Sequence, residues 1–189
     1  AVSHEHTVQQ FYNNALPCYL EIMGDRWHHG DPDAVAAGLS RVRACEILEE
    51  RMAELAGLDA TKKVLDFGCG TGSNSFIFDP EYYLGVDVDT GRIDLACQLH
   101  PGYTFQYLED GKIKAPDQSF DMIVILAVIH HVSDKDFISY LDELKRVLKP
   151  GGVIVSIEPV LDIKTPLNNW FMNFFDDGRY IRFENQYRE

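Results

Sequence analysis

The sequence lacks the long apolar run that a membrane-spanning helix requires. Although 46% of its 189 residues are hydrophobic, no stretch approaches the roughly 20 consecutive apolar residues that cross a bilayer. The first residues show no signal-peptide pattern, and residue 1 is Ala rather than Met, so the natural N-terminus can lie upstream. We therefore expect no membrane partner.

Cysteines are few, and no two of them form a C-x-x-C pair. The four thiols are far apart in the sequence, at Cys18, Cys45, Cys69 and Cys97. This spacing argues against a disulfide framework and is typical of free thiols in a reducing compartment. We expect a cytoplasmic protein.

Basic residues are also scarce, with 17 Lys and Arg against 30 Asp and Glu, which gives a net charge of -13. Proteins that bind nucleic-acid phosphates normally present a basic face. Nucleic acid is therefore not the expected partner. The length and the hydrophobic content are sufficient for an ordinary globular domain with a core of its own.

The most informative segment is Val64–Gly72, where an apolar run enters three alternating glycines. A second apolar run, Tyr83–Val86, ends in Asp87, fifteen residues after Gly72. Glycines let a backbone adopt positive φ and approach a ligand closely. A carboxylate at the end of the next strand can accept both hydrogen bonds of a ribose diol. The pattern predicts a site for a nucleoside cofactor.

Strands and helices alternate along the rest of the core. The apolar patterns predict five strands, at Lys63–Phe67, Tyr83–Val88, Tyr103–Leu108, Asp121–Leu126 and Val153–Ile157. Predicted helices are a short one of two turns over Ser73–Phe78, one at Arg92–Leu99, and one after the capping box of Ser133 and Asp136. Pro150–Gly152 is expected to break the chain before the fifth strand. Such alternation predicts an α/β, Rossmann-like open and mainly parallel sheet with helices on both faces.

A helix is predicted near each end of the chain. Apolar residues from Val35 to Leu55 recur at helical spacing and predict one amphipathic helix, and Pro166–Phe175 predicts another. We divide the chain into an N-terminal helical segment (1–58), a Rossmann-like core (59–160) and a C-terminal helical segment (161–189).

Four segments in order resemble class I S-adenosylmethionine-dependent methyltransferases, of type 11 or 12 with small-molecule acceptors. They are Val64–Gly72 (VLDFGCGTG), Leu84–Asp89 (LGVDVD), Ser119–Val132 (SFDMIVILAVIHHV) and Leu144–Gly152 (LKRVLKPGG). The resemblance implies S-adenosylmethionine as cofactor and S-adenosylhomocysteine as product. It covers roughly residues 60–160.

The resemblance also implies which residues hold the cofactor. The loop residues Gly68, Cys69 and Gly70 would lie against the methionine moiety and the ribose, and Asp66 would meet the amino group. Asp87 would hold both ribose hydroxyls. The rest of the implied site is Val88 on the adenine face, Glu109 or Asp110 at the adenine amino group, and Leu126 near the sulfonium.

Two other functions are weighed against methyl transfer. A nicotinamide-dependent redox enzyme would carry G-x-G-x-x-G and a pyrophosphate, whereas this loop is G-x-G-x-G and follows Asp66, which would repel a pyrophosphate. A cofactor-binding partner or regulatory domain without turnover is the second alternative.

Methyl transfer is an in-line displacement from an activated donor, so the protein chiefly aligns the reactants. A base is needed only where the acceptor loses a proton early. The candidates are His130 and His131, which follow the fourth strand; the structural alternative is a helix-entry histidine bonded to backbone. The N-terminal candidates for a lid or for substrate contact are Tyr12, Tyr19, Trp27, His28 and His29, with plain packing as their alternative. No metal is expected, because these histidines have no acidic or thiol partner at ligand spacing.

Members of the resembled family add two more strands beside the fifth, and this sequence has no room for them. The sheet is therefore expected to be truncated, with an apolar fifth-strand edge. The hypothesis is either a missing C-terminal segment or a homodimer that covers this edge.

Overall fold

The computed structural model describes residues 32–40, 43, 47, 61–161, 163–164, 166–167, 169–170 and 179–187. The chain divides into two compact units, residues 1–55 and 56–189. The second unit contains the sheet and is described first.

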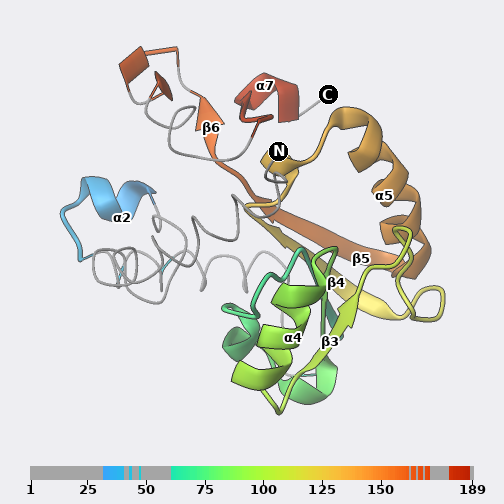
Figure 1. Ribbon diagram of the computed structural model, residues 1–189. Coiled ribbons are helices and arrows are strands. Elements are labelled where there is room, and N and C mark those ends of the chain that lie inside the picture. Colours follow the sequence, from blue (N-terminus) through green and yellow to red (C-terminus); the bar gives the residue numbers. More distant parts are fainter. Residues whose placement is uncertain are drawn as a thin grey trace, which may run out of the picture. The chain divides into compact units, whose positions relative to one another are not determined.

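The core of the second unit is a five-stranded, all-parallel sheet in the order β3-β2-β1-β4-β5 (Figure 1). The strands are β1 (Val64–Phe67), β2 (Tyr83–Asp87), β3 (Thr104–Tyr107), β4 (Phe120–Leu126) and β5 (Leu148–Ile157). The prediction of an open, parallel α/β sheet is confirmed.

The central strands are apolar because both of their faces are covered. All four residues of β1 are buried, and Leu65 and Ile123 on neighbouring strands are fully inaccessible. Leu65 shares a core cluster with Leu144 and Val147 of α5 (Asp134–Val147). The chain leaves β1 toward β2 and β3, and then returns through β4 to β5. Helix α4 (Thr90–Leu99) connects β2 to β3, and α5 connects β4 to β5 on the other side of β1. Because crossovers between parallel strands are right-handed and these two run in opposite directions, the two helices lie on opposite faces of the sheet (Figure 1).

The caps of these helices follow from the sequence. Asp89 accepts a hydrogen bond from Arg92 N at the start of α4, and Ser133 accepts one from Asp136 N at the start of α5. The N-cap predicted at Ser133 is confirmed, and Asp136 Oδ2 in turn accepts a hydrogen bond from Ser133 Oγ at 2.7 Å. The two-turn helix over Ser73–Phe78 is wrong, because only one 3-10 turn forms, η1 (Ser75–Ile77). Asp79 already caps the next turn, η2 (Pro80–Tyr82), which leaves no length for a helix.

The break expected at Pro150–Gly152 is also wrong, because β5 runs through it. The pairing shifts register instead, from Phe120 opposite Leu148 to Met122 opposite Val153. Gly151 has φ +80° in this irregular stretch, a conformation that glycine adopts without strain. Among the described residues, β5 ends the five-stranded sheet, so the hypotheses about its outer edge stay open.

The described part of the first unit corrects the helix predicted over 35–55. Helix α2 spans Pro32–Ala36, and Gly38 with φ +75° follows its end. Residues 37–40 are not helical, and Leu39, which was expected in a buried stripe, is 46% exposed. Arg43 and Ile47 are helical.

After β5 the second unit has a small parallel pair, β6 (Val160–Leu161) with β7 (Arg182–Phe183), followed by α7 (Glu184–Tyr187). The described residues of the predicted helix 166–175 are helical. Within the described ranges, no helix is long and apolar enough to cross a membrane.

Candidate active site

The candidate cofactor residues lie at one edge of the sheet. Because all five strands are parallel, their carboxyl ends meet at this edge, where ligands of open α/β sheets bind. The glycine loop follows β1, and Asp87 is the last residue of β2. The loop after β4 also reaches this edge, since an ideal Cβ on Gly68 would lie 2.4 Å from Cγ2 of Val128.

The glycine loop is folded over the end of β2 by backbone hydrogen bonds. Gly68 N and Cys69 N both donate to Val86 O, at 2.8 and 3.0 Å. Gly68 and Gly70 have φ of +78° and +56°, as expected for a turn that requires glycine. The two glycines differ in their surroundings, because a Cβ on Gly70 would meet nothing within 4 Å. Gly70 therefore faces open space.

Asp87 joins the loop to the second strand. Its Oδ2 accepts a hydrogen bond from Gly70 N and its Oδ1 accepts one from Asp89 N, both at 2.9 Å. The side chain is buried, with 5% of its surface exposed. A carboxylate oxygen can accept two hydrogen bonds, so each oxygen keeps one lone pair for a ligand hydroxyl.

Asp66 lies below the loop, with 1% of its surface exposed. Its Oδ2 accepts a hydrogen bond from the Tyr83 hydroxyl at 2.8 Å. Burial raises the pKa of the Asp66 carboxyl to about 7, while the Tyr83 hydrogen bond lowers it and the nearby Asp87 raises it. Burial likewise raises the pKa of the Cys69 thiol, which is neutral at physiological pH.

The remaining candidates lie on the same edge with different exposure. Val88 is 56% exposed immediately after Asp87. Glu109 forms an ion pair with Lys114 at 3.4 Å on the surface. Asp110 follows in a turn with φ +50°. Leu126, at the end of β4, pairs with Ile157. The structure brings these residues to the cofactor edge, and their individual roles stay predictions.

The histidine pair forms the 3-10 turn η3 (Ile129–His131) after β4. His130 is buried, and its Nδ1 lies 2.7 Å from Glu158 Oε2. His131 is exposed, with its ring centroid 4.1 Å from that of His130. The turn thus carries one inward and one outward imidazole.

Glu158 is the site residue that sequence reasoning missed. Besides His130 Nδ1, it accepts backbone hydrogen bonds from Val128, Ile129 and His130, at 3.0, 2.8 and 3.2 Å. Its side chain is 5% exposed. The available signal was its position, because Glu158 is a lone acid directly after an apolar strand whose carboxyl end reaches the ligand edge.

The C-terminal segment secures the same turn from outside. Tyr180 N donates to His130 O at 2.9 Å. Arg182 donates to Ile129 O and to Val132 O, each at 3.2 Å, and pairs with Asp134. The histidine turn is therefore held by Glu158 on one side and by Arg182 on the other.

The candidates Tyr12, Tyr19, Trp27, His28 and His29 lie outside the described residues. In the part of the chain that the structure describes, no cluster of three or more His, Cys, Asp or Glu is arranged to hold a metal ion.

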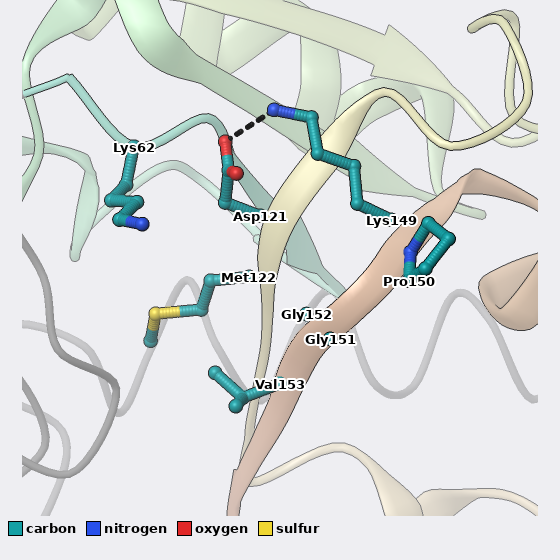
Figure 2. Close-up of a pocket in the computed structure, with 8 residues that line it drawn as sticks. All are labelled: Lys62, Asp121, Met122, Lys149, Pro150, Gly151, Gly152 and Val153. Carbon is teal, nitrogen blue, oxygen red and sulfur yellow. Dashed lines mark hydrogen bonds and ion pairs between the residues drawn. The ribbon is translucent and has the colours of Figure 1, made fainter.

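A polar pocket of about 200 Å³ lies at the opposite edge of the sheet, at the amino ends of β4 and β5. Figure 2 shows Lys149 reaching Asp121 beside Lys62, and the Lys149–Asp121 ion pair measures 2.7 Å. Because this pocket lies away from the glycine loop, we do not assign it to the active site.

Comparison with known proteins agrees with this geometry. Residues 65–156 match the family described as methyltransferase domain. The 2-methyl-6-phytyl-1,4-hydroquinone methyltransferase of Synechocystis is 32% identical over 158 residues, which cover 76% of this chain and 47% of that protein. The 27-O-demethylrifamycin SV methyltransferase of Amycolatopsis mediterranei is 27% identical over 141 residues, covering 70% of this chain and 50% of that protein.

Among solved structures, the [4+2]-cyclase SpnF is 25% identical with a TM-score of 0.68, covering 95% of this chain and 68% of that one. The parallel sheet, the glycine loop and the acid at the end of β2 define a Rossmann-like domain of the class I type. With the family match, the chain belongs to the S-adenosylmethionine-dependent methyltransferases. It spans about half the length of the curated relatives it matches.

Proposed function

We propose that this protein binds S-adenosylmethionine at the glycine loop and transfers its methyl group to a small-molecule acceptor. The observation that carries the proposal is the hydrogen bond from Gly70 N to the Asp87 carboxylate, at the edge where the carboxyl ends of the strands meet. The curated relatives reported above are named for a hydroquinone and for a rifamycin, which supports a small organic acceptor.

The residues present fit this cofactor. Gly70 faces open space where a side chain would obstruct a ligand. Asp87 keeps lone pairs for two ribose hydroxyls, and exposed Val88 follows it. Asp66 is an acid rather than a cation, which suits an ammonium group and disfavours a pyrophosphate. S-adenosylmethionine would supply an activated methyl group, so the protein chiefly positions the acceptor.

On the acceptor side, we propose His130 as the base for acceptors that must lose a proton. Glu158 lies 2.7 Å from His130 Nδ1, which would fix the orientation of the ring. His131 is exposed on the same turn, and we propose it as an acceptor contact. The N-terminal segment 1–58, with its tyrosines and paired histidines, is proposed as a lid, and segment 161–189 as part of the substrate region.

Isothermal titration calorimetry tests which cofactor the protein binds. We expect binding of S-adenosylhomocysteine, no binding of NADH, and loss of the first in Asp87→Ala. Binding of NADH alone would support the redox alternative. Undiminished binding of S-adenosylhomocysteine by Asp87→Ala would contradict the assigned site.

The second candidate function is cofactor binding without methyl transfer. The specific observation in its favour is the similarity to SpnF, which is named as a [4+2]-cyclase and not as a methyltransferase. Incubation with radiolabelled S-adenosylmethionine and a panel of hydroxyl, amine and carbon acceptors separates the two. Labelled product supports methyl transfer, whereas tight binding without turnover supports the second function. A tRNA sample in the panel tests our proposal that nucleic acid is not an acceptor, which rests on the net charge of -13.

We also propose that the outer edge of β5 is covered, either by a C-terminal segment beyond this sequence or by a second copy in a homodimer. Ile154 on this strand is 40% exposed. Intact mass and size-exclusion chromatography test both versions. A soluble monomer of 21.5 kDa would contradict both. A cytoplasmic location is proposed on the basis of the cysteine spacing.

A further inference from the structure

The hydroxyl of Tyr83 is part of a contact that cofactor binding alone does not explain. Tyr83 is the first residue of β2, at the strand end remote from the ligand edge. Its ring is buried among Phe78, Tyr103 and Phe105, with ring centroids 5.4–5.8 Å away. Its Oη nevertheless reaches Asp66 Oδ2 at 2.8 Å.

A glycine makes this reach possible. Gly85 lies two residues further along β2, on the same face as Tyr83, and is the register partner of Asp66. An ideal Cβ on Gly85 would lie 2.9 Å from Tyr83 Oη and 2.9 Å from Cys69 Sγ. The side chain of Tyr83 therefore lies along the strand in space that any other residue at position 85 would fill. The three positions 66, 83 and 85 form one arrangement beneath the glycine loop.

We propose that Tyr83 is a positioning residue of the cofactor site, whose hydroxyl holds the Asp66 carboxylate ionised and oriented toward the amino group of the cofactor. This inference rests on the proposed function.

The surroundings of Asp66 make the contact sensitive to pH. The titratable groups that act on Asp66 are Tyr83 and Asp87 on β2, and Asp66 in turn acts on Cys69 in the loop. Tyr83 and Cys69 are neutral at physiological pH, because burial raises the pKa of each. Burial and Asp87 favour the protonated form of Asp66, whereas the Tyr83 hydrogen bond opposes them. Removing the Tyr83 hydroxyl therefore raises the pKa of Asp66 from about 7.

The test is the pH dependence of S-adenosylhomocysteine binding to Tyr83→Phe and to the wild type, by calorimetry from pH 6 to pH 9. If the ligand ammonium requires an ionised Asp66, affinity rises with pH through the pKa of that group. Loss of one hydrogen bond to a charged group shifts this pKa by about one unit. By linkage, Tyr83→Phe then binds about ninefold more weakly at pH 6, about fivefold at pH 7, and almost equally at pH 9.

The matched control is Tyr103→Phe. This variant removes a hydroxyl from the same aromatic cluster, where Tyr103 donates to Phe78 O at 3.2 Å and not to Asp66. We expect its pH profile to match that of the wild type. A Tyr83→Phe deficit that is the same at every pH, or no deficit, overturns the inference and leaves cofactor binding intact. A wild type that binds no S-adenosylhomocysteine at any pH overturns the proposed function as well.

If Tyr83→Phe does not fold, genetically encoded 3-fluorotyrosine at position 83 gives the opposite perturbation with little change in shape. Its more acidic phenol is a stronger donor and should shift the midpoint of the pH profile below that of the wild type. An unchanged or higher midpoint would contradict the assigned role of the hydroxyl.

Discussion

Alanine at Gly68 and alanine at Gly70 should have different consequences, although the two positions are only two residues apart. Both residues have positive φ, which costs an alanine about 1–2 kcal/mol. At Gly68 the new Cβ would also lie 2.4 Å from Val128 Cγ2, and such overpacking costs about 1–3 kcal/mol more. At Gly70 the Cβ meets no protein atom within 4 Å. Gly68→Ala is therefore predicted to lose about 2–5 kcal/mol of stability, and Gly70→Ala about 1–2 kcal/mol.

Thermal unfolding and calorimetry together test this pair. For a chain of this size we expect Tm to fall by about 4–20 °C in Gly68→Ala and by about 2–8 °C in Gly70→Ala. Gly70→Ala should lose S-adenosylhomocysteine binding while it stays folded, because its Cβ enters the proposed ligand space. Val128→Ala should restore part of the stability of Gly68→Ala, since it removes the two closest atoms.

Two results would refute this reasoning. Equal stability of the two variants would show that the Val128 contact does not restrict Gly68. Full ligand binding by Gly70→Ala would show that the cofactor does not approach the open side of the loop.

Further predictions concern α5 and its connections. Hydrogen bonds from Arg146, then from Ile113 N and Lys112, lower the pKa of the Glu143 carboxyl to about 2. Glu143 therefore stabilises the fold above its ordinary pKa of 4.5, and this contribution is lost as pH falls toward 2. Because Lys112 and Arg146 are partly solvated, we expect Glu143 to contribute at most about 3 kcal/mol to the free energy of unfolding. In urea unfolding, the stability of Glu143→Gln should therefore fall less steeply at acid pH than that of the wild type. Ser133→Ala should cost about 1 kcal/mol in the same assay by removing the N-cap of α5, and an unchanged midpoint would contradict this role.

The core strands were predictable because their signal is local. The apolar run at Leu65 and the acid at position 87 are readable within a few residues, and the parallel sheet follows from the alternation of elements. The helix over Ser73–Phe78 was overestimated because Asp79 caps a second short turn, which competes for the same residues. Strand β5 continues through Gly151 because it pairs with β4, and the local sequence does not indicate that pairing.

The contacts around the site also differ in how well the sequence predicts them. The glycine loop and Asp87 were predicted because their motif is contiguous. Glu158 was missed because its partners Val128 and His130 lie about 30 residues earlier in the sequence. The reach of Tyr83 to Asp66 depends on the missing side chain of Gly85, which only a register between strands reveals.

The hydrogen bonds that hold the histidine turn have a consequence for synthesis of the chain. The contacts of the cofactor edge join Asp66, Gly70, Tyr83 and Asp87, which all leave the ribosome within about two dozen residues. Within the described ranges, the last backbone partners of the histidine turn are Tyr180 and Arg182, some fifty residues after His130. Domains generally fold as units, and β1 pairs with β4 as well as with β2. The cofactor edge therefore needs the chain up to β4, whereas the histidine turn needs it up to Arg182 as well.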